Sequence, residues 1–474
     1  MTELHDLTAL EQASAIREGQ TTAVELTEHY LSRSERLSGE VGAFITLTAE
    51  SALAQASAAD EIVRAASDPG ELPVLWGVVC PTKDLNQVAG VHCTFGSKAL
   101  QIDAVADDNV VSNLRKGGLV FTGTTNTPEF GLPCYTENDI APPARTPWDL
   151  TRSAGGSSGG AGAAVAAGLA PIAQGSDGGG SIRIPASVCG LVGLKPSRGR
   201  VSNGPLPDGL GELAVQGPLA RTVRDAAALL DVMTGGFPDD PFLAPPLDPG
   251  HSFLDAASRE PGILRVGRYC TPVIADSEVD PECLAAYEAT SDLLEELGHV
   301  VEDVPPPFGH DTVGSFEVIW AAGAAGIPIP PERESELLPL TTWLRERGMR
   351  ASGVELTRAL AIARSVARMV IQATASYDVI LTPTLAKPPV PIGSIRNDAD
   401  PAADFEAQKA FTPFTAPYNI TGQPALSLPL YRTAEGLPIG SQFIGRPRDE
   451  VTLLSLGAQL EQARPWLGWT PDLW

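Results

Sequence analysis

Apolar positions recur at helical spacing near the start of the chain. Leu26, Tyr30 and Leu31 form such a repeat behind a pair of threonines, a residue type that caps helix starts. The pattern therefore predicts that residues 1–70 are mainly helical.

From Val74 the pattern changes to apolar runs that alternate with amphipathic segments. The run VLWGVVC has the composition of a buried strand and is followed by the polar PTKDLNQVAG. Such alternation is typical of an α/β sheet with crossover helices. The pattern predicts strands at 74–80, 119–126, 264–269, 377–383, 425–430 and 437–444, and helices at 108–116, 161–168, 221–235, 281–297, 356–376 and 450–462.

Residues 305–355 show no clear period and are broken by the proline-rich runs PPPFG and IPIPPERE. We expect this segment to be irregular. There is no internal repeat and no linker of boundary composition. The simplest prediction is one α/β domain over residues 1–474, with helical additions.

Composition narrows the function classes. The chain carries 33 Lys and Arg against 58 Asp and Glu, a formal net charge of −25, which argues against direct binding to nucleic acid. Its six cysteines form no CxxC pair, so we expect free thiols in a reducing compartment. No signal-peptide pattern opens the chain, and the small-residue run 161–173 is too short to span a bilayer. A cytoplasmic protein without membrane contact is expected.

A serine motif points to one chemistry that the surrounding residues disfavour. Gly155–Gly159 and Gly156–Gly160 both match G-x-S-x-G, the nucleophile elbow of α/β-hydrolases. That elbow needs an apolar strand before it, whereas PARTPWDLTRSA stands here, and no histidine follows His310. Metal and phosphate motifs (H-E-x-x-H, paired Cys/His, G-x-G-x-x-G and the Walker pattern) are also missing, so no metal or cofactor is expected.

A serine activated by lysine is the other possibility. Lys83 follows a predicted strand, and a buried lysine with a lowered pKa can act as a general base. Ser181 ends the run SDGGGS, whose glycines let backbone N–H groups converge as an oxyanion hole requires. Each feature alone fits a solvated lysine or a flexible turn, but their combination favours catalysis.

The run GGSSGGAGAAVAAGLAPIAQGSDGGGSIRIPASVCGLVGLKPSRGRVS resembles the signature of the amidase signature family. The segments GVVCPTKDLNQVAG, TGTTNTPEFG, TPWDLTRSAGGSSGG, YDVILTPTLAKPP, PFTAPYNITGQPALSLPL and GLPIGSQFIG are also similar to that family. The resemblance covers nearly the whole chain and is weakest at 300–360. It implies an α/β fold with a large twisted mixed sheet covered by helices on both faces. Within one domain it implies a helical segment at 1–70, a signature core at 74–235 and a variable pocket region at 300–360.

Carried over residue by residue, the resemblance implies that Ser181 is the nucleophile, Ser157 the bridging serine and Lys83 the base. The two serines are 181 − 157 = 24 positions apart, the spacing that this family shows. It further implies a cis peptide between Gly156 and Ser157.

The family resemblance also places the oxyanion hole. It implies that the backbone N–H groups of Gly178, Gly179, Gly180 and Ser181 bind the oxyanion. Gly178 departs from the family, which often has a larger residue there. The sequence around Ser181 is most similar to the family branch that contains nylon-oligomer and small-amide hydrolases. Ile184 occupies a position where the amidotransferase A subunit usually has glutamine.

The substrate pocket is expected in segments that flank the signature core. Few charges occur there, which favours a neutral, fairly apolar substrate. The candidate pocket residues are Leu132, Cys134, Tyr135, Phe316, Trp320, Tyr418 and Ile420.

Near the nucleophile, Asp177 and Arg183 are predicted to form a structural ion pair that fixes the loop. Cys189 is expected in the core, and Ser153 and Ser158 are expected to hydrogen-bond the loop without reacting.

Two functions follow from the resemblance. The first is a stand-alone amidase that cleaves neutral aryl or alkyl amides, amide oligomers or carbamates with water. The second is the A-type subunit of a tRNA-dependent amidotransferase, which releases ammonia from glutamine for a partner subunit. A homodimer is one assembly open to the chain.

Overall fold

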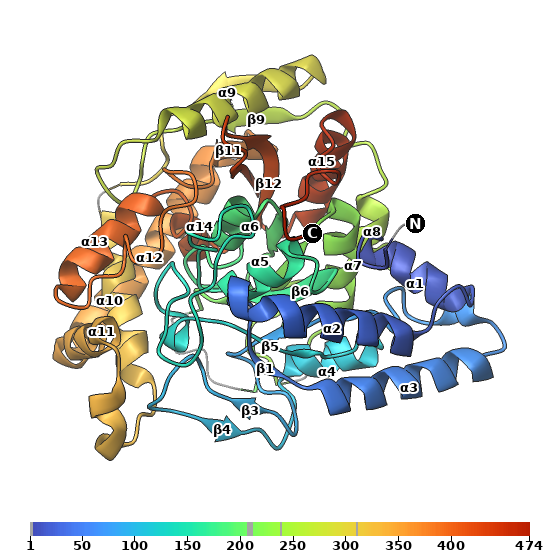
Figure 1. Cartoon of the computed structure of the whole chain (residues 1–474). Coiled ribbons are helices and arrows are strands. Elements are labelled where there is room, and N and C mark those ends of the chain that lie inside the picture. Colours follow the sequence, from blue (N-terminus) through green and yellow to red (C-terminus); the bar gives the residue numbers. More distant parts are fainter. Residues whose placement is uncertain (1–2, 206–211, 238, 310) are drawn as a thin grey trace.

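The centre of the molecule is a mixed eight-stranded sheet (Figure 1). The structure is a computed structural model that describes residues 3–205, 212–237, 239–309 and 311–474. The strands follow the order β10 (Val300–Asp303), β9 (Arg265–Arg268), β11 (Val379–Pro383), β13 (Pro438–Gly445), β12 (Ala425–Arg432), β7 (Val192–Lys195), β8 (Val215–Ala220) and β6 (Ile172–Asp177). The pairs β10/β9 and β9/β11 are parallel, and the other neighbours are antiparallel.

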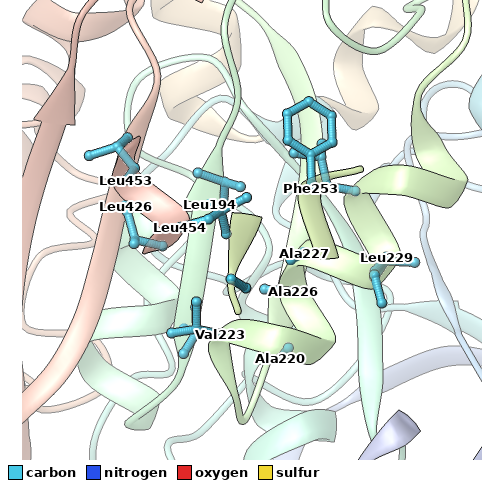
Figure 2. Close-up of a cluster of buried hydrophobic side chains, with 14 of the residues drawn as sticks. Leu194, Ala220, Val223, Ala226, Ala227, Leu229, Phe253, Leu426, Leu453 and Leu454 are labelled. Carbon is cyan, nitrogen blue, oxygen red and sulfur yellow. The ribbon is translucent and has the colours of Figure 1, made fainter. Parts of the chain in front are cut away.

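Helices cover both faces of this sheet, which confirms the predicted fold class. On one face lie α7 (Val223–Met233), α9 (Pro281–Glu296) and α15 (Glu450–Ala463), with α8 (Phe253–Ala256) beside them. Figure 2 shows the core there, where Val223 of α7 and Leu453 of α15 lie near Leu194 and Leu426 of the sheet. The opposite face carries α5 (Gly159–Ala166) and α6 (Arg183–Cys189).

A smaller three-stranded sheet lies next to the β6 edge. Its order is β1 (Phe44–Leu47), β5 (Gly123–Thr125) and β2 (Thr82–Lys83), and the backbone N–H of Gln174 in β6 donates to Pro81 O at 3.2 Å. Of the N-terminal helices α1 (Ala9–Arg17), α2 (Ala23–Val41) and α3 (Ala49–Ala65), the last two pack together beside this sheet, whereas α1 packs against α7 (Figure 1). Thr22 and Glu25 form a capping box at the start of α2, as the sequence suggested. The short strand β1 interrupts the helical segment predicted for 1–70.

The prediction that residues 305–355 are irregular is wrong, because most of this segment is helical. It contains α10 (Asp311–Gly326) and α11 (Pro339–Arg350), joined by a 3₁₀ helix at Pro331–Glu336. Two of its prolines start helices instead of breaking them: Pro331 begins the 3₁₀ helix, and Pro339 occupies the first turn of α11, where its missing N–H needs no partner. With α12 (Gly353–Thr374) and α13 (Pro401–Phe411), these helices form one side of the molecule, and α14 (Pro417–Thr421) lies inward of them against α12 (Figure 1).

The prediction of a strand at 74–80 is also wrong. The segment is buried but mainly in turns, with one isolated bridge between Val79 and Val120, and the strand predicted at 119–126 shortens to β5. A short apolar run alone does not distinguish a strand from another buried segment. The four later strands and the six helices predicted outside 1–70 are present, with shifted ends. The remaining elements are α4 (Asn109–Lys116), β3 (His92–Cys93), β4 (Ile102–Asp103) and 3₁₀ turns at Pro69–Glu71 and Glu129–Gly131. Among the described residues, no helix is both long and apolar enough to cross a bilayer.

Candidate active site

Lys83 lies in β2 and is completely buried. Its backbone N–H donates to Gln174 Oε1 at 2.8 Å, which fixes the strand against β6. Its Nζ donates to two hydroxyl oxygens, Ser157 Oγ at 2.7 Å and Ser176 Oγ at 3.0 Å. The amine is therefore directed at a serine cluster and not at solvent.

Burial lowers the pKa of Lys83 to about 7, because the charged ammonium loses its hydration; the nearby Asp177 opposes part of this effect. A lysine with this pKa is substantially neutral near pH 7. Only the neutral amine can accept a proton, so the environment suits Lys83 to act as a general base.

Ser157 follows a cis peptide bond from Gly156 and precedes α5. Two glycines make room for this turn. A Cβ on Gly156 would lie 2.6 Å from the carbonyl carbon of Tyr135, and a Cβ on Gly131 would lie 3.2 Å from Ser157 Oγ. The adjacent Ser158 exchanges two hydrogen bonds with the backbone of Ser176, which ties the serine turn to the end of β6.

Ser181 lies between β6 and α6, after the turn formed by Gly178–Gly180, and it lines a cavity. Its carbonyl oxygen accepts a hydrogen bond from the backbone N–H of Ser158 at 3.2 Å, which holds the two serine loops side by side. No hydrogen bond joins Ser181 Oγ to Ser157 Oγ among the described residues. A proton relay between them requires a closer approach, which catalytic hydrogen bonds commonly make only when substrate is bound.

The glycine turn presents backbone donors beside Ser181. The N–H of Gly180 donates to Asp177 Oδ1 at 2.8 Å and is therefore already engaged. Within the described part of the chain, the N–H groups of Gly178, Gly179 and Ser181 have no acceptor. These three amides are the ones free to bind an oxyanion.

The predicted ion pair beneath this turn is present. Arg183 and Asp177 are both fully buried, with Nη2 and Oδ1 2.9 Å apart. Burial alone would raise the pKa of Asp177, but the charge and hydrogen bonds of Arg183 bring it below its usual range. Arg183 also donates to Thr415 O and Asn419 Oδ1, which lie in one segment, and to Gln442 Oε1 of β13, so the pair anchors the nucleophile turn to two distant segments.

The cavity at Ser181 is mainly apolar and contains most of the predicted pocket residues. Its lining includes Leu132, Cys134, Phe316, Trp320 and Ile420 from that set, together with Gly179, Ile184, Phe405, Ala416 and Pro417. Phe316 and Trp320, one turn apart on α10, stack with ring centroids 5.2 Å apart. The walls therefore come from α10, α13, α14 and the loop after β5.

Two predicted pocket residues do not line this cavity. The hydroxyl of Tyr135 donates to Asp404 Oδ2 at 2.7 Å, and the hydroxyl of Tyr418 lies 2.9 Å from that of Tyr269. Each phenol group has found a buried polar partner, which a tyrosine removed from water usually requires. Both side chains therefore support the walls from behind.

The structure adds residues that the sequence reasoning missed. Ser176 contacts Lys83, and its signal was its position in β6 just before the glycine turn. Glu317 and Lys409 also line the cavity, as an ion pair 2.7 Å apart. Because they lie 92 positions apart on α10 and α13, no local motif could have joined them.

Away from the cavity, one group within the described residues has metal-ligand chemistry. Atoms of Glu3, His5 and His29 lie within 4.8 Å of one another. The two imidazoles already hydrogen-bond each other at 2.9 Å, and burial together with the nearby charge of Arg33 lowers the pKa of both. A nearby guanidinium disfavours a cation, so this cluster is explained as packing.

Comparison with known proteins identifies the family of the chain. The family profile described as Amidase matches residues 25–454. The 6-aminohexanoate-cyclic-dimer hydrolase of Paenarthrobacter ureafaciens is 36% identical, over 98% of this chain and 96% of its own. An acylamidase of Rhodococcus erythropolis is 35% identical, over 98% of each chain.

Among solved structures, a 6-aminohexanoate cyclic dimer hydrolase complexed with substrate superimposes with a TM-score of 0.90 and 34% identity, over 100% of both chains. Sequence and fold thus agree over the full length. The chain belongs to the amidase signature family of amide-hydrolysing enzymes.

Proposed function

We propose that the protein is a serine hydrolase that cleaves carboxylic amide C–N bonds through an acyl-enzyme on Ser181. The single observation that carries this proposal is the contact of a buried lysine with a serine hydroxyl. Lys83 Nζ lies 2.7 Å from Ser157 Oγ, and Ser157 adjoins the loop that carries Ser181 into the cavity.

In the proposed reaction, neutral Lys83 accepts a proton from Ser157, which accepts one from Ser181. The Ser181 oxygen attacks the amide carbonyl, and the free N–H groups of Gly178, Gly179 and Ser181 bind the tetrahedral oxyanion. The proton returns through Ser157 to the departing nitrogen, and the C–N bond breaks. Water then hydrolyses the acyl-enzyme by the same relay.

The cavity supports neutral substrates with apolar acyl or amine groups. Its walls are largely apolar, and such walls gain free energy by burying hydrocarbon. Aryl and alkyl amides, amide oligomers and carbamates share the required carbonyl chemistry. The similarity to a cyclic-dimer hydrolase and to an acylamidase supports the same range.

A panel of five compounds tests the proposal: an aryl anilide, a short aliphatic amide, glutamine, a 6-aminohexanoate oligomer and an aryl carbamate. We expect the purified protein to hydrolyse at least one neutral amide or carbamate unaided. Turnover should be lost in both Ser181→Ala and Lys83→Ala. Turnover that survives in Ser181→Ala would refute the proposed nucleophile.

The same panel separates the alternative function. An amidotransferase subunit would release ammonia from glutamine only with a partner present, and would leave the other compounds intact. If the protein hydrolyses none of the four compounds other than glutamine, the proposal of a stand-alone amidase is therefore overturned. We further propose a cytoplasmic location and a homodimeric state, the latter measurable by light scattering.

A further inference from the structure

Gly179 differs from the two glycines beside it. Its backbone is half-buried and lines the cavity, whereas Gly178 and Gly180 are buried. Gly180 has a φ of +135°, and a Cβ there would lie 2.8 Å from Ile184 Cδ1 and closer still to Thr415 Oγ1. The turn therefore requires glycine at position 180.

The fold makes no such demand at Gly179. Its φ lies outside the left-handed region, so any residue can adopt its backbone conformation. A Cβ built there would meet two atoms within 4 Å in the described part of the chain, apart from its chain neighbours: Phe316 Cζ at 3.5 Å and Ala416 Cβ at 3.9 Å. Both are ordinary van der Waals distances. The glycine thus leaves open a space, on the cavity side, that a methyl group would fill.

The two walls of this space are held in place. The Phe316 ring stacks on Trp320 with centroids 5.2 Å apart. Thr415, which precedes Ala416, donates from Oγ1 to Gly179 O at 2.7 Å. Neither wall can therefore move far to admit a larger group, because packed interiors resist small displacements.

The proposed reaction decides which part of a substrate comes here. Of the four groups on the tetrahedral carbon, one is the Ser181 oxygen and one is the oxyanion at the glycine turn. The departing nitrogen must face Ser157, which returns the proton and contacts Lys83. The acyl carbon takes the remaining position, next to the oxyanion amides, where the space at Gly179 opens on the cavity.

We propose that Gly179, Phe316 and Ala416 form an acyl slot that admits only groups without a branch next to the attacked carbonyl. The inference rests on the proposed function, since the acyl group is the one transferred to Ser181. It narrows the substrates to amides whose acyl carbon is unbranched at that position and to carbamates, whose alkoxy oxygen carries a single substituent. Gly179 is then a specificity-determining residue as well as an oxyanion donor.

Two pairs of isomeric p-nitroanilides test the slot. The first pair carries butanoyl and 2-methylpropanoyl groups, and the second carries 3-methylbutanoyl and 2,2-dimethylpropanoyl groups. The members of a pair contain the same atoms and differ in whether a branch lies next to the carbonyl. The readout is the branch ratio, defined as kcat/KM of the member without that branch divided by kcat/KM of the member with it.

We expect Gly179→Ala to raise the branch ratio about tenfold, since one methyl group in a confined pocket changes specificity by about this factor. Phe316→Ala should lower it by a similar factor. The double variant should return towards the wild-type ratio, because the added methyl group faces the space that the ring has left.

Phe405→Ala is the matched control. Phe405 also lines the cavity, but from α13, and it is not among the atoms near Gly179. Its branch ratio should equal that of the wild type, and it should not offset the effect of Gly179→Ala. An unchanged ratio in Gly179→Ala would overturn the proposal. An equal loss on both isomers would do the same, since it would indicate a distorted oxyanion turn.

Thermal unfolding checks the premise that the fold does not need this glycine. Gly179→Ala should keep or raise the wild-type Tm, because alanine restricts the unfolded chain and fits the native backbone. Gly180→Ala should lower the Tm, since its Cβ would collide with Thr415 and Ile184. Equal losses of Tm in the two variants would overturn the proposal.

Failure of the slot and failure of the proposed function are distinguishable. If the wild type cleaves no anilide, the proposed function fails, and calorimetry then measures the ratio of Kd within each pair for the wild type and for Gly179→Ala. A ratio that Gly179→Ala leaves unchanged overturns the slot in that case too. If Phe316→Ala does not fold, as judged by circular dichroism, the ratio in Gly179→Ala decides the proposal.

Discussion

Two lysines among the described residues are completely buried, and their contacts distinguish them. Burial lowers the pKa of both Lys83 and Lys195 to about 7. Lys195 Nζ donates to the carbonyl of Pro196, whereas Lys83 Nζ contacts the hydroxyls of Ser157 and Ser176. A lowered pKa is thus common to both, and only the geometry around Lys83 provides a proton path.

The pH dependence of activity follows from the Lys83 environment. Below its pKa of about 7 the amine is protonated and cannot accept a proton, so activity should rise with pH and level off above that value. We expect log kcat/KM of a neutral amide to rise with a slope near one between about pH 5 and pH 7. A profile that is flat or falls over this range would contradict Lys83 as the base.

Ser176 is a positioning residue for Lys83. Its hydroxyl oxygen accepts from Nζ at 3.0 Å, and such an acceptor stabilises the protonated amine. Ser176→Ala should therefore lower the pKa of Lys83 and shift the acid limb of the profile to lower pH, with kcat reduced about tenfold. Ser153→Ala, which removes an acceptor for the Gly155 N–H in the neighbouring loop, is the control and should leave the limb in place. If the acid limb of the pH profile does not move in Ser176→Ala, Ser176 contributes only to packing and is not a positioning residue for Lys83.

At the scale of elements, α5 fixes the serine turn through close backbone contacts. A Cβ on Gly160 would lie 2.2 Å from the backbone nitrogen of Asn126 and 2.5 Å from Ala43 O. On Gly162 it would lie 3.0 Å from Pro185 Cβ and 3.3 Å from Cys189 Sγ. Gly160 therefore has no room for a methyl group, whereas the space at Gly162 is merely tight.

We therefore expect Gly160→Ala to lower the free energy of unfolding by about 3 kcal/mol, because backbone must move. Gly162→Ala should change it by about 1 kcal/mol or less, since the helix propensity of alanine offsets the crowding. Urea unfolding of both variants measures the difference. The opposite order of stabilities would contradict the packing described for α5.

The sequence predicted the elements with a clear period and failed where the pattern was ambiguous. The helix at 281–297 and the strand at 437–444 have long periodic or alternating patterns, and both are present as α9 and β13. In contrast, α10 is apolar nearly all round, and β6 offers no alternation of apolar and polar residues. Both escaped prediction because their burial is decided by neighbours distant in the chain.

At the scale of the whole molecule, Arg183 connects the nucleophile turn to segments more than 200 positions away. It pairs with Asp177 and donates to Asn419, 236 positions along the chain, and to Gln442, 259 positions along. Removing one partner of such a pair leaves an uncompensated buried charge.

Arg183→Met should accordingly destabilise the protein by about 3–5 kcal/mol. It should also abolish turnover, because the carboxylate that orders the glycine turn loses its counter-charge. Arg350→Met is the control, since its side chain is 76% exposed and its ion pair with Glu346 lies on the surface. Equal stability of the two variants in thermal unfolding would contradict the anchoring role of Arg183.

The candidate site divides into a part visible in the sequence and a part that needs the fold. Ser157 and Ser181 lie within one glycine-rich stretch, so local motifs could identify them. The cavity walls come from segments as distant as Leu132 and Ile420, and helix packing alone decides which aromatic side chains reach it. Tyr135 shows the limit, because its neighbour Cys134 lines the cavity while its own hydroxyl binds Asp404.

The central claim is that Ser181 carries the acyl group, and intact-protein mass spectrometry tests it most directly. An aryl carbamate should add the mass of one carbamoyl group to the wild-type protein, with release of the phenol and the adduct mapped to the peptide containing Ser181. Ser181→Ala should gain no mass under the same conditions, while Lys83→Ala should label far more slowly. An adduct on another residue, or labelling of Ser181→Ala at the wild-type rate, would contradict the proposed nucleophile.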